Sequence, residues 1–163
     1  MHGRLYDFFE KDHRRIEDLL NRATIHEGEF DLKKYGLFRA ALLRHIGLEE
    51  RILFPAAQSA RSGEPFPAFP KIRLDHGALT ALMVPPPTPS IVATIRKILT
   101  EHDALEESNG GPYDACEQLA AERIDELLDT LKRAPEVRIL PHRDEPFVLE
   151  ATKRAVERAG YKL

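Results

Sequence analysis

Apolar residues recur at steps of three or four along most of the chain, which is the spacing of one face of an α-helix. The first stripe comprises Leu5, Phe9, His13, Ile16 and Leu20. The second stripe comprises Phe38, Leu42, His45, Glu49, Ile52 and Ala56. Residues 21–30 between the two stripes predict a loop, and Asp31 is suited to cap the second helix. Pro55 predicts a kink in that helix, or its end, near Phe54.

Two more stripes predict two further helices. The third comprises Ile72, His76, Leu79 and Met83, and lies between a proline-rich connection over residues 62–70 and the prolines at 85–87. The fourth begins near residues 88–90 and comprises Ile91, Ile95, Ile98, His102 and Leu105 or Glu106. After an interruption at residues 109–112, we expect a helix from Cys116 to Arg133, an irregular segment over 135–146, and a short helix over 147–159 that ends at Gly160.

The predicted elements define one fold class. No stretch alternates with a period of two for long enough to predict a β-strand. Helices joined by short connections pack up and down against their neighbours. We therefore predict an all-α fold, an antiparallel up-down four-helix bundle over residues 1–134 with a short C-terminal helical extension over residues 135–163. The extension carries no chemistry that the sequence defines, and it either covers the bundle or contacts a partner.

Composition and charge argue against several classes of partner and of cellular location. A chain of 163 residues suits a single domain, and its net charge of −3, with both signs mixed, argues against a nucleic-acid partner. No apolar run is long enough to span a bilayer, and the N-terminal residues lack an apolar signal core. We therefore expect a cytoplasmic protein without a membrane partner. The single cysteine, Cys116, excludes an intrachain disulfide and is expected to be a small residue within a helix.

Each of the four predicted bundle helices carries one histidine on its apolar stripe: His13, His45, His76 and His102. A buried imidazole needs partners for its ring nitrogens, and a single such residue is usually a hydrogen-bonded core histidine. Four of them, one on each helix, could converge at one level of the bundle, where metal sites are commonly built.

A repeated motif adds carboxylates to these histidines. The segment His45-Ile-Gly-Leu-Glu49-Glu50 matches His102-Asp-Ala-Leu-Glu106-Glu107. A spacing of four places each histidine and the first glutamate on one helix face, one turn apart. The second glutamate of each pair lies next to the inward face and is explained as an exposed acid, whereas Glu49 and Glu106 lie on the core stripe.

The number of inward polar groups predicts a two-metal site. Four imidazoles and two carboxylates are too many ligands for one tetrahedral zinc ion. If Glu49 and Glu106 bridge two metals, each metal has two nitrogens and two oxygens from the protein, and open positions remain for water, for an oxo or hydroxo bridge, or for dioxygen. Imidazole with carboxylate suits iron or manganese, and zinc shares these ligand types.

These residues resemble the hemerythrin-like (HHE cation-binding) family over residues 5–131. The resemblance rests on Asp12-His13, on HIGLEERILFP over residues 45–55, on Asp75-His76 and on HDALEE over residues 102–107. It implies a four-helix bundle with a non-haem di-iron centre, two iron ions joined by an oxo or hydroxo bridge. It also implies six metal ligands in this chain: His13, His45, Glu49, His76, His102 and Glu106.

The chain departs from the oxygen-carrying hemerythrins at two positions. Those proteins have an additional histidine where this chain has Ile72, and an aspartate where it has Glu107. Family members with the reduced ligand set resemble iron- or oxygen-responsive proteins more than carriers. Glu50, Glu107 or Glu17 could fill a vacancy in the ligand set. The remaining histidines, His2, His26 and His142, fall in predicted termini or loops and are expected to be solvated.

Several functions remain open at this point. A di-iron centre could bind or sense O₂, NO, peroxide or iron itself, or could belong to an iron-handling or metal-centre repair module. A metal-free helical interaction domain is a further alternative. An enzyme is less favoured, because no Ser-His-Asp order, glycine-rich phosphate loop or CxxC motif accompanies the ligands. The sequence does not define a protein partner or a homo-oligomer.

Overall fold

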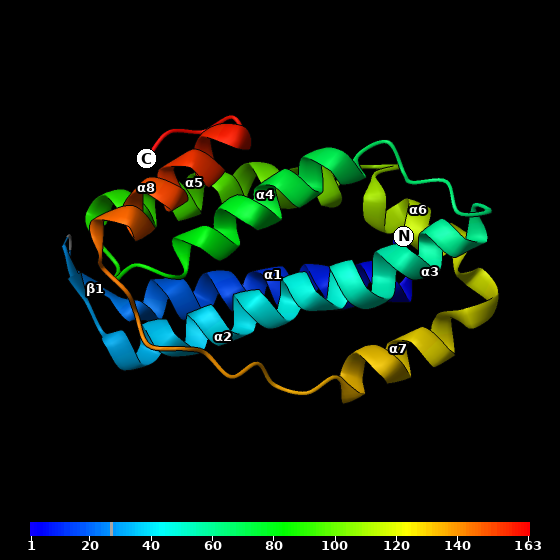
Figure 1. Cartoon of the computed structure of the whole chain (residues 1–163). Helices are drawn as coiled ribbons and strands as arrows, with labels where there is room; N and C mark the ends of the chain where they lie inside the picture. Colours follow the sequence, from blue (N-terminus) through cyan, green and yellow to red (C-terminus); the bar gives the residue numbers. More distant parts are fainter. Residues whose placement is uncertain (27) are drawn as a thin grey trace.

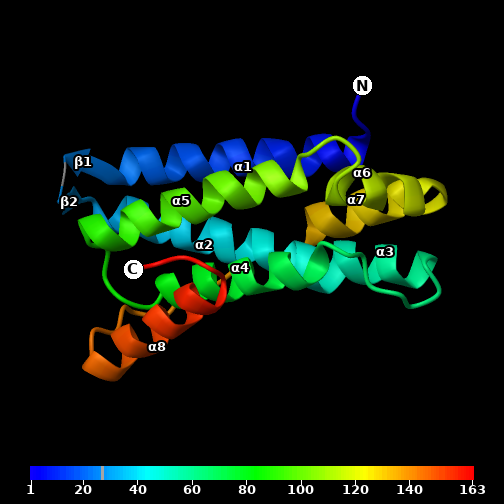
Figure 2. The same cartoon turned by 90° about the horizontal axis from the view of Figure 1, so that it is seen from above.

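The computed structural model describes residues 1–26 and 28–163 and is predominantly helical (Figure 1). Four long helices lie alongside one another when Figures 1 and 2 are compared: α1 (Arg4–Ala23), α2 (Leu32–Leu48), α4 (Phe69–Leu82) and α5 (Pro89–Glu106). The structure agrees with the predicted all-α class.

The helix ends follow local sequence signals. The side chain of Asp31 accepts a hydrogen bond from the backbone N–H of Lys34 and so caps α2, as predicted. Thr88 caps α5 in the same way by accepting from the N–H of Ile91. Pro89 follows at the first helical position, where the N–H that proline lacks would have no partner within the helix. These caps determine where α2 and α5 begin.

The second predicted helix does not end near Phe54. At Glu49 it passes into a π-helical turn, η1 (Glu49–Leu53), and then into α3 (Phe54–Ala60). Of the two outcomes expected near Phe54, a kink or an end, the end is not observed, because Pro55 lies in the first turn of α3, where a missing N–H is tolerated. The regular α-helix is nevertheless interrupted directly before Phe54, by the π-helical turn. Such π-helical turns are frequent at functional sites, and this one begins at a predicted metal ligand.

A short hairpin replaces part of the predicted loop over residues 21–30. Strand β1 (Thr24–His26) pairs antiparallel with β2 (Glu29–Phe30), so the expectation of no strand is wrong here. Elements of two or three residues are too short to show an alternating pattern. Gly28 adopts a φ of 84°, which glycine tolerates without strain. Glu27, within the same predicted loop, lies outside the described residues.

The predicted helix from Cys116 to Arg133 is interrupted. The chain forms α6 (Pro112–Leu119), the 3₁₀ turn η2 (Ala121–Arg123) and α7 (Ile124–Arg133). Continuous apolar periodicity misled the prediction, because the pattern continues across a turn that changes the direction of the chain (Figure 1). Cys116 is buried within α6, as expected.

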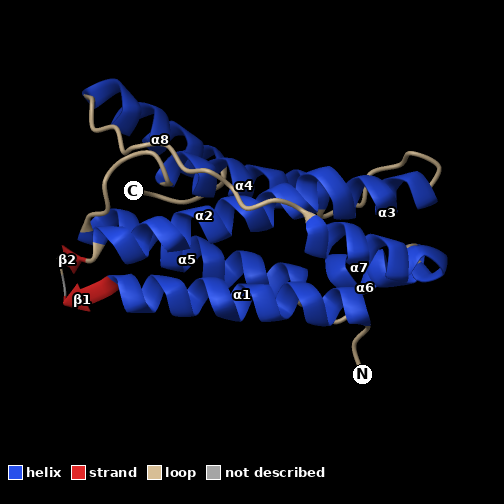
Figure 3. Cartoon of the chain, turned by 90° about the horizontal axis from the view of Figure 1, so that it is seen from below, coloured by secondary structure: helices blue, strands red, loops and turns tan. Residues whose placement is uncertain are grey.

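The C-terminal extension covers the long helices. Residues 135–145 run without regular structure along α2 toward the hairpin end, and α8 (Pro146–Arg158) then packs on α4 (Figure 3). The buried guanidinium of Arg39 holds this segment, since it donates to the backbone oxygens of Leu140 at 3.0 Å and Met83 at 2.9 Å. Of the two expected roles, the structure shows the packing of the extension on the long helices.

The apolar core consists of two clusters separated along the helix axes. The cluster at the hairpin end includes Tyr35, Phe38, Leu79, Ile95 and Val156, and the cluster at the α6–α7 end includes Phe9, Phe54, Phe69, Tyr113 and Leu131. On each long helix the predicted histidine lies at the boundary of the two clusters. Over the described ranges 1–26 and 28–163, no helix is long and apolar enough to cross a membrane.

Candidate metal centre

The six predicted ligands lie together between the two apolar clusters. The four histidines are each at most 4% exposed, and Glu49 and Glu106 are 0% exposed. All six side chains come from the four long helices, or from the π-helical turn that continues α2. The helical stripes therefore place one layer of polar groups within an otherwise apolar interior.

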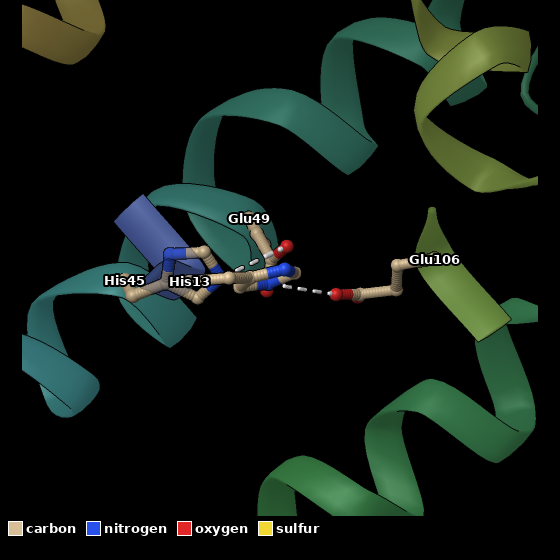
Figure 4. A group of neighbouring side chains, drawn as sticks. All are labelled: His13, His45, Glu49 and Glu106. Atoms are coloured by element: carbon tan, nitrogen blue, oxygen red, sulfur yellow. Dashed lines mark hydrogen bonds and ion pairs between the residues drawn. The ribbon is translucent and has the colours of Figure 1, made fainter. Parts of the chain in front are cut away.

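The first group of donors comprises His13, His45, Glu49 and Glu106, whose candidate ligand atoms all lie within 4.8 Å of one another. The Nε2 atoms of His13 and His45 are 3.0 Å apart. Glu49 Oε1 lies 3.4 Å from His45 Nε2, and Glu106 Oε2 lies 3.4 Å from His13 Nε2. Figure 4 shows Glu106 reaching from α5 toward His13, with His45 and Glu49 side by side on the helix opposite.

The second group comprises His76, His102 and the same two glutamates, again within 4.8 Å of one another. The Nε2 atoms of His76 and His102 are 3.2 Å apart. Glu49 Oε2 lies 3.1 Å from His76 Nε2, and Glu106 Oε1 lies 3.3 Å from His102 Nε2. Each glutamate thus presents one oxygen to the first group and its other oxygen to the second, which is the arrangement of a bridging carboxylate.

Two of these carboxylate oxygens are better suited to bind a metal than to pair with the neighbouring side chains. Glu49 Oε2 and Glu106 Oε1 are buried and form no hydrogen bond with any residue that the structure describes. The histidine nitrogens beside them are close, but they do not have the alignment of a hydrogen bond. An unpaired buried carboxylate oxygen costs free energy, and a cation between it and the imidazole nitrogen would offset that cost. The buried His/Glu cluster could therefore hold metal ions.

A carboxylate lies next to the outer nitrogen of each of the four predicted histidine ligands. The Nδ1 atoms of His13 and His76 lie 2.6 Å and 2.7 Å from the carboxylates of Glu107 and Glu50. With Nδ1–H donating outward, each Nε2 keeps a lone pair for the interior, which is the usual arrangement of a metal-bound histidine. Glu50 and Glu107 are thus placed to orient these two histidines, and Glu107 also forms a third candidate donor group with His13 and Asp103.

The other two histidines follow the same rule with aspartates. Asp12 Oδ2 lies 2.9 Å from His45 Nδ1, and Asp75 Oδ2 lies 3.3 Å from His102 Nδ1. The pairs are related by an approximate internal repeat, since α1 with α2 supplies the same residues as α4 with α5. Both aspartates directly precede a histidine of the ligand set, but spacing alone did not assign them a partner.

In the metal-free protein, protons supply positive charge at this site. Burial alone would lower the pKa of His13, but the neighbouring carboxylates of Glu106 and Glu107 outweigh it and raise the pKa to about 9. For His45, burial again opposes protonation, while Glu49 and Asp12 raise the pKa to about 10. Burial and the Glu49 charge would raise the pKa of Glu106, but the neighbouring histidines lower it to about 2. The carboxylates of the cluster therefore favour positive charge on the neighbouring imidazoles.

Tyr113 is a component of the site that sequence reasoning missed. It lies on α6 and is 1% exposed, and its hydroxyl oxygen lies 2.5 Å from Glu49 Oε1 and 2.9 Å from Glu106 Oε2. Burial, with the charges of both glutamates, raises its pKa well above the ordinary value. No periodic pattern marks Tyr113, because the turn at residues 107–111 separates it from the stripe of α5.

A cavity of about 380 Å³ lies next to the site. Its walls include His13, His45 and His102, with apolar side chains of α1, α2, α4 and α5. Asp103 also lines it, with its Oδ1 atom 3.7 Å from His13 Nε2, and burial raises the pKa of this carboxyl group. The volume suits a small ligand approaching the donors.

The remaining predicted residues lie away from the donor groups. Glu17 is exposed and pairs with Arg14 at the surface, 3.8 Å away. His2 and His26 are exposed, as expected. His142 is not fully solvated, because its ring is half-buried and stacks on Tyr35 at 5.9 Å between centroids.

Searches for similar proteins add no identification. The chain matches no protein-family model, no curated protein and no solved structure.

Proposed function

We propose that the chain is a hemerythrin-like protein that holds a non-haem di-iron centre and uses it to bind or sense O₂, NO, peroxide or iron. The observation that carries the proposal is the pair of donor groups that share Glu49 and Glu106. Each group offers two imidazole nitrogens and two carboxylate oxygens, a donor set that suits iron or manganese. Zinc remains possible, but it favours four ligands without the shared carboxylates.

The arrangement of α1, α2, α4 and α5 supports an antiparallel up-down four-helix bundle of the hemerythrin type. The ligand set that the resemblance implies is the set that lies together between these helices. At the position of the additional histidine of oxygen carriers, Ile72 is fully buried in the apolar cluster near α6. This favours a responsive or sensing protein over an oxygen carrier.

The residues around the donors have separable tasks. Asp12, Glu50, Asp75 and Glu107 hold the histidine rings so that their Nε2 atoms face inward. The apolar clusters on either side exclude bulk water from the donor layer. The neighbouring cavity gives a small molecule access to the donors. Iron bound here would supply reversible one-electron chemistry and an exchangeable coordination position.

The first test is the metal content of the protein, purified without added metal or chelator and also after anaerobic iron loading. We expect two irons per chain, one for each donor group. The matched variant is His45→Ala with His102→Ala, which removes one nitrogen from each group. Retention of both irons in this double variant, or no metal in the wild-type chain after loading, would contradict the proposal.

The second test asks whether the loaded centre responds to a small ligand. Reduced protein mixed with O₂ in a stopped-flow instrument should develop a near-ultraviolet absorption, and the double variant should not. A loaded protein whose spectrum does not change with O₂, NO or peroxide would exclude binding and sensing of these ligands while leaving metal binding intact.

An iron-handling or metal-repair module is the second candidate. Metal and protons compete for the same histidine nitrogens, so in such a module metal loss can be coupled to proton uptake. Thermal melts with and without iron discriminate, because a melt that is indifferent to iron argues against this role. If the chain were instead a metal-free interaction domain, the substitution His45→Ala would not reduce the amount of iron that it binds.

A further inference from the structure

Tyr113 reaches the donor layer from outside the four long helices. Its hydroxyl oxygen lies 3.0 Å from His13 Nε2, 2.5 Å from Glu49 Oε1 and 2.9 Å from Glu106 Oε2. These atoms are three of the four donors of the first group. A tyrosine that only filled space or satisfied its hydroxyl would need one such neighbour, whereas this one meets three donors of a single group.

The distances match those between neighbouring ligands of one metal. With metal–ligand bonds of about 2.0–2.1 Å, adjacent ligands at right angles are about 3.0 Å apart. Two of the three distances from the Tyr113 oxygen are close to this value, 3.0 Å to His13 Nε2 and 2.9 Å to Glu106 Oε2, as is the 3.0 Å between His13 Nε2 and His45 Nε2. The third, 2.5 Å to Glu49 Oε1, is the distance of a short hydrogen bond from the phenol. We propose that Tyr113 is a fifth protein ligand of the metal in the His13–His45 group. The proposal rests on the proposed di-metal function.

The chain is built to bring this side chain inward. After α5 the helix stops, Gly110 adopts a φ of 70°, and α6 begins at Pro112. A Cβ atom at Gly111 would overlap with Ser108 and press on the backbone oxygen of Leu105, so only glycine fits this close return of the chain. The ring of Tyr113 then stacks on Phe9 of α1, with 5.1 Å between ring centroids.

The second donor group has no equivalent of Tyr113. In the approximate repeat, Tyr113 follows Glu107 by six residues, and the residue six after Glu50 is Ala56, which cannot bind a metal. No tyrosine hydroxyl lies within hydrogen-bond distance of His76 or His102 in the part of the chain that the structure describes. The two metals are therefore inequivalent, one with five protein donors and the other with four.

Coordination exchanges a proton for the metal. The O–H bond of Tyr113 breaks, an oxygen–metal bond forms, and the proton leaves to solvent together with those displaced from the histidines. No oxidant or reductant is needed for this step. Without metal the single hydrogen of this hydroxyl is donated to Glu49 or to Glu106.

The test uses the full chain loaded anaerobically with iron(II) and then oxidised in air to iron(III). A phenolate bound to iron(III) gives a charge-transfer band in the visible region, and resonance Raman excitation in that band enhances the ring modes of the tyrosine. We expect both signals in the wild-type protein. Tyr113→Phe should lose both while it keeps two irons per chain.

The other three tyrosines provide matched controls. Tyr6→Phe, Tyr35→Phe and Tyr161→Phe should each keep the band, and this result assigns it to Tyr113 by elimination even if Tyr113→Phe does not fold. Wild-type protein with two bound irons and no phenolate modes would overturn the proposal and leave Tyr113 as a hydrogen-bond donor only. Absence of bound iron would instead contradict the proposed function itself.

Discussion

Lys71 Nζ lies 2.5 Å from Asp75 Oδ1, and the other oxygen of that carboxylate lies 3.3 Å from His102 Nδ1. The same ammonium group donates to the backbone oxygen of Ala159 at 2.8 Å, just beyond α8. A predicted metal ligand is thus connected through a buried carboxylate to the C-terminal extension. Both oxygens of this carboxylate, which is 1% exposed, therefore have a side-chain partner.

Replacing Asp75 should weaken metal binding without removing a ligand. In Asp75→Asn the neutral amide no longer holds the imidazole of His102 by a charge-assisted bond, so we expect metal affinity to fall about 10- to 100-fold. Competition with a chromophoric chelator measures this. Asp18→Asn is the matched control, since Asp18 pairs only with Arg22 on the surface of α1. Equal affinities for the two variants would show that Asp75 does not support the centre.

Loss of the shared carboxylate of Glu49 should reduce metal binding more than loss of any single histidine. Glu49 offers an oxygen to both donor groups, whereas His45 belongs to the first group alone. We therefore expect Glu49→Ala to lose both metals and His45→Ala to lose only the metal of its own group. Metal content per chain, with circular dichroism to verify helix content, measures the difference. Two metals retained in Glu49→Ala would contradict a bridging role.

The metal-free protein should lose stability as the pH rises above neutrality. The pKa values of His13 and His45 rise from 6.5 in the unfolded chain to about 9 and about 10 in the folded one. Between pH 6.5 and these higher values the folded state binds more protons than the unfolded state, so the free energy of unfolding decreases as the pH rises. Below pH 6.5 the two histidines contribute their full stabilisation of the folded state.

Acid should destabilise the same protein for the opposite reason. The pKa of Glu106 falls from 4.5 to about 2 on folding, so its contribution is present above 4.5 and lost as the pH falls toward 2. Urea unfolding of chelator-treated protein across this range should show greatest stability between pH 4.5 and 6.5. A midpoint that stays constant from neutral to alkaline pH would contradict the histidine shifts.

Arg39 should hold the C-terminal extension on α2. Arg39→Met keeps the apolar stem but removes the bonds to Met83 and Leu140, and hydrogen bonds from a charged donor contribute about 1.5–3 kcal/mol. We expect a loss of stability of that size, measured by urea unfolding, and faster proteolysis within residues 135–145. The control Arg22→Met removes an exposed ion pair on α1 and should change neither the stability nor the rate of proteolysis.

The histidine layer was predictable because it depends on helical spacing. Steps of three and four placed His13, His45, His76 and His102 on inward stripes, and the repeated His-x₃-Glu motif added Glu49 and Glu106 to the same faces. Each of these six side chains is buried, as the stripes predicted. Their use as metal ligands stays a prediction until metal is measured.

The amino-acid sequence by itself determined the four long helices and the histidines and glutamates that they turn inward, because both follow from local periodicity and local caps. Only the tertiary structure decided which carboxylate meets which histidine, since Asp12 and Glu107 reach their partners across helices. It also decided that Tyr113 enters the site, because a glycine-dependent turn and the packing against Phe9 place that ring, and neither leaves a periodic signal in the sequence.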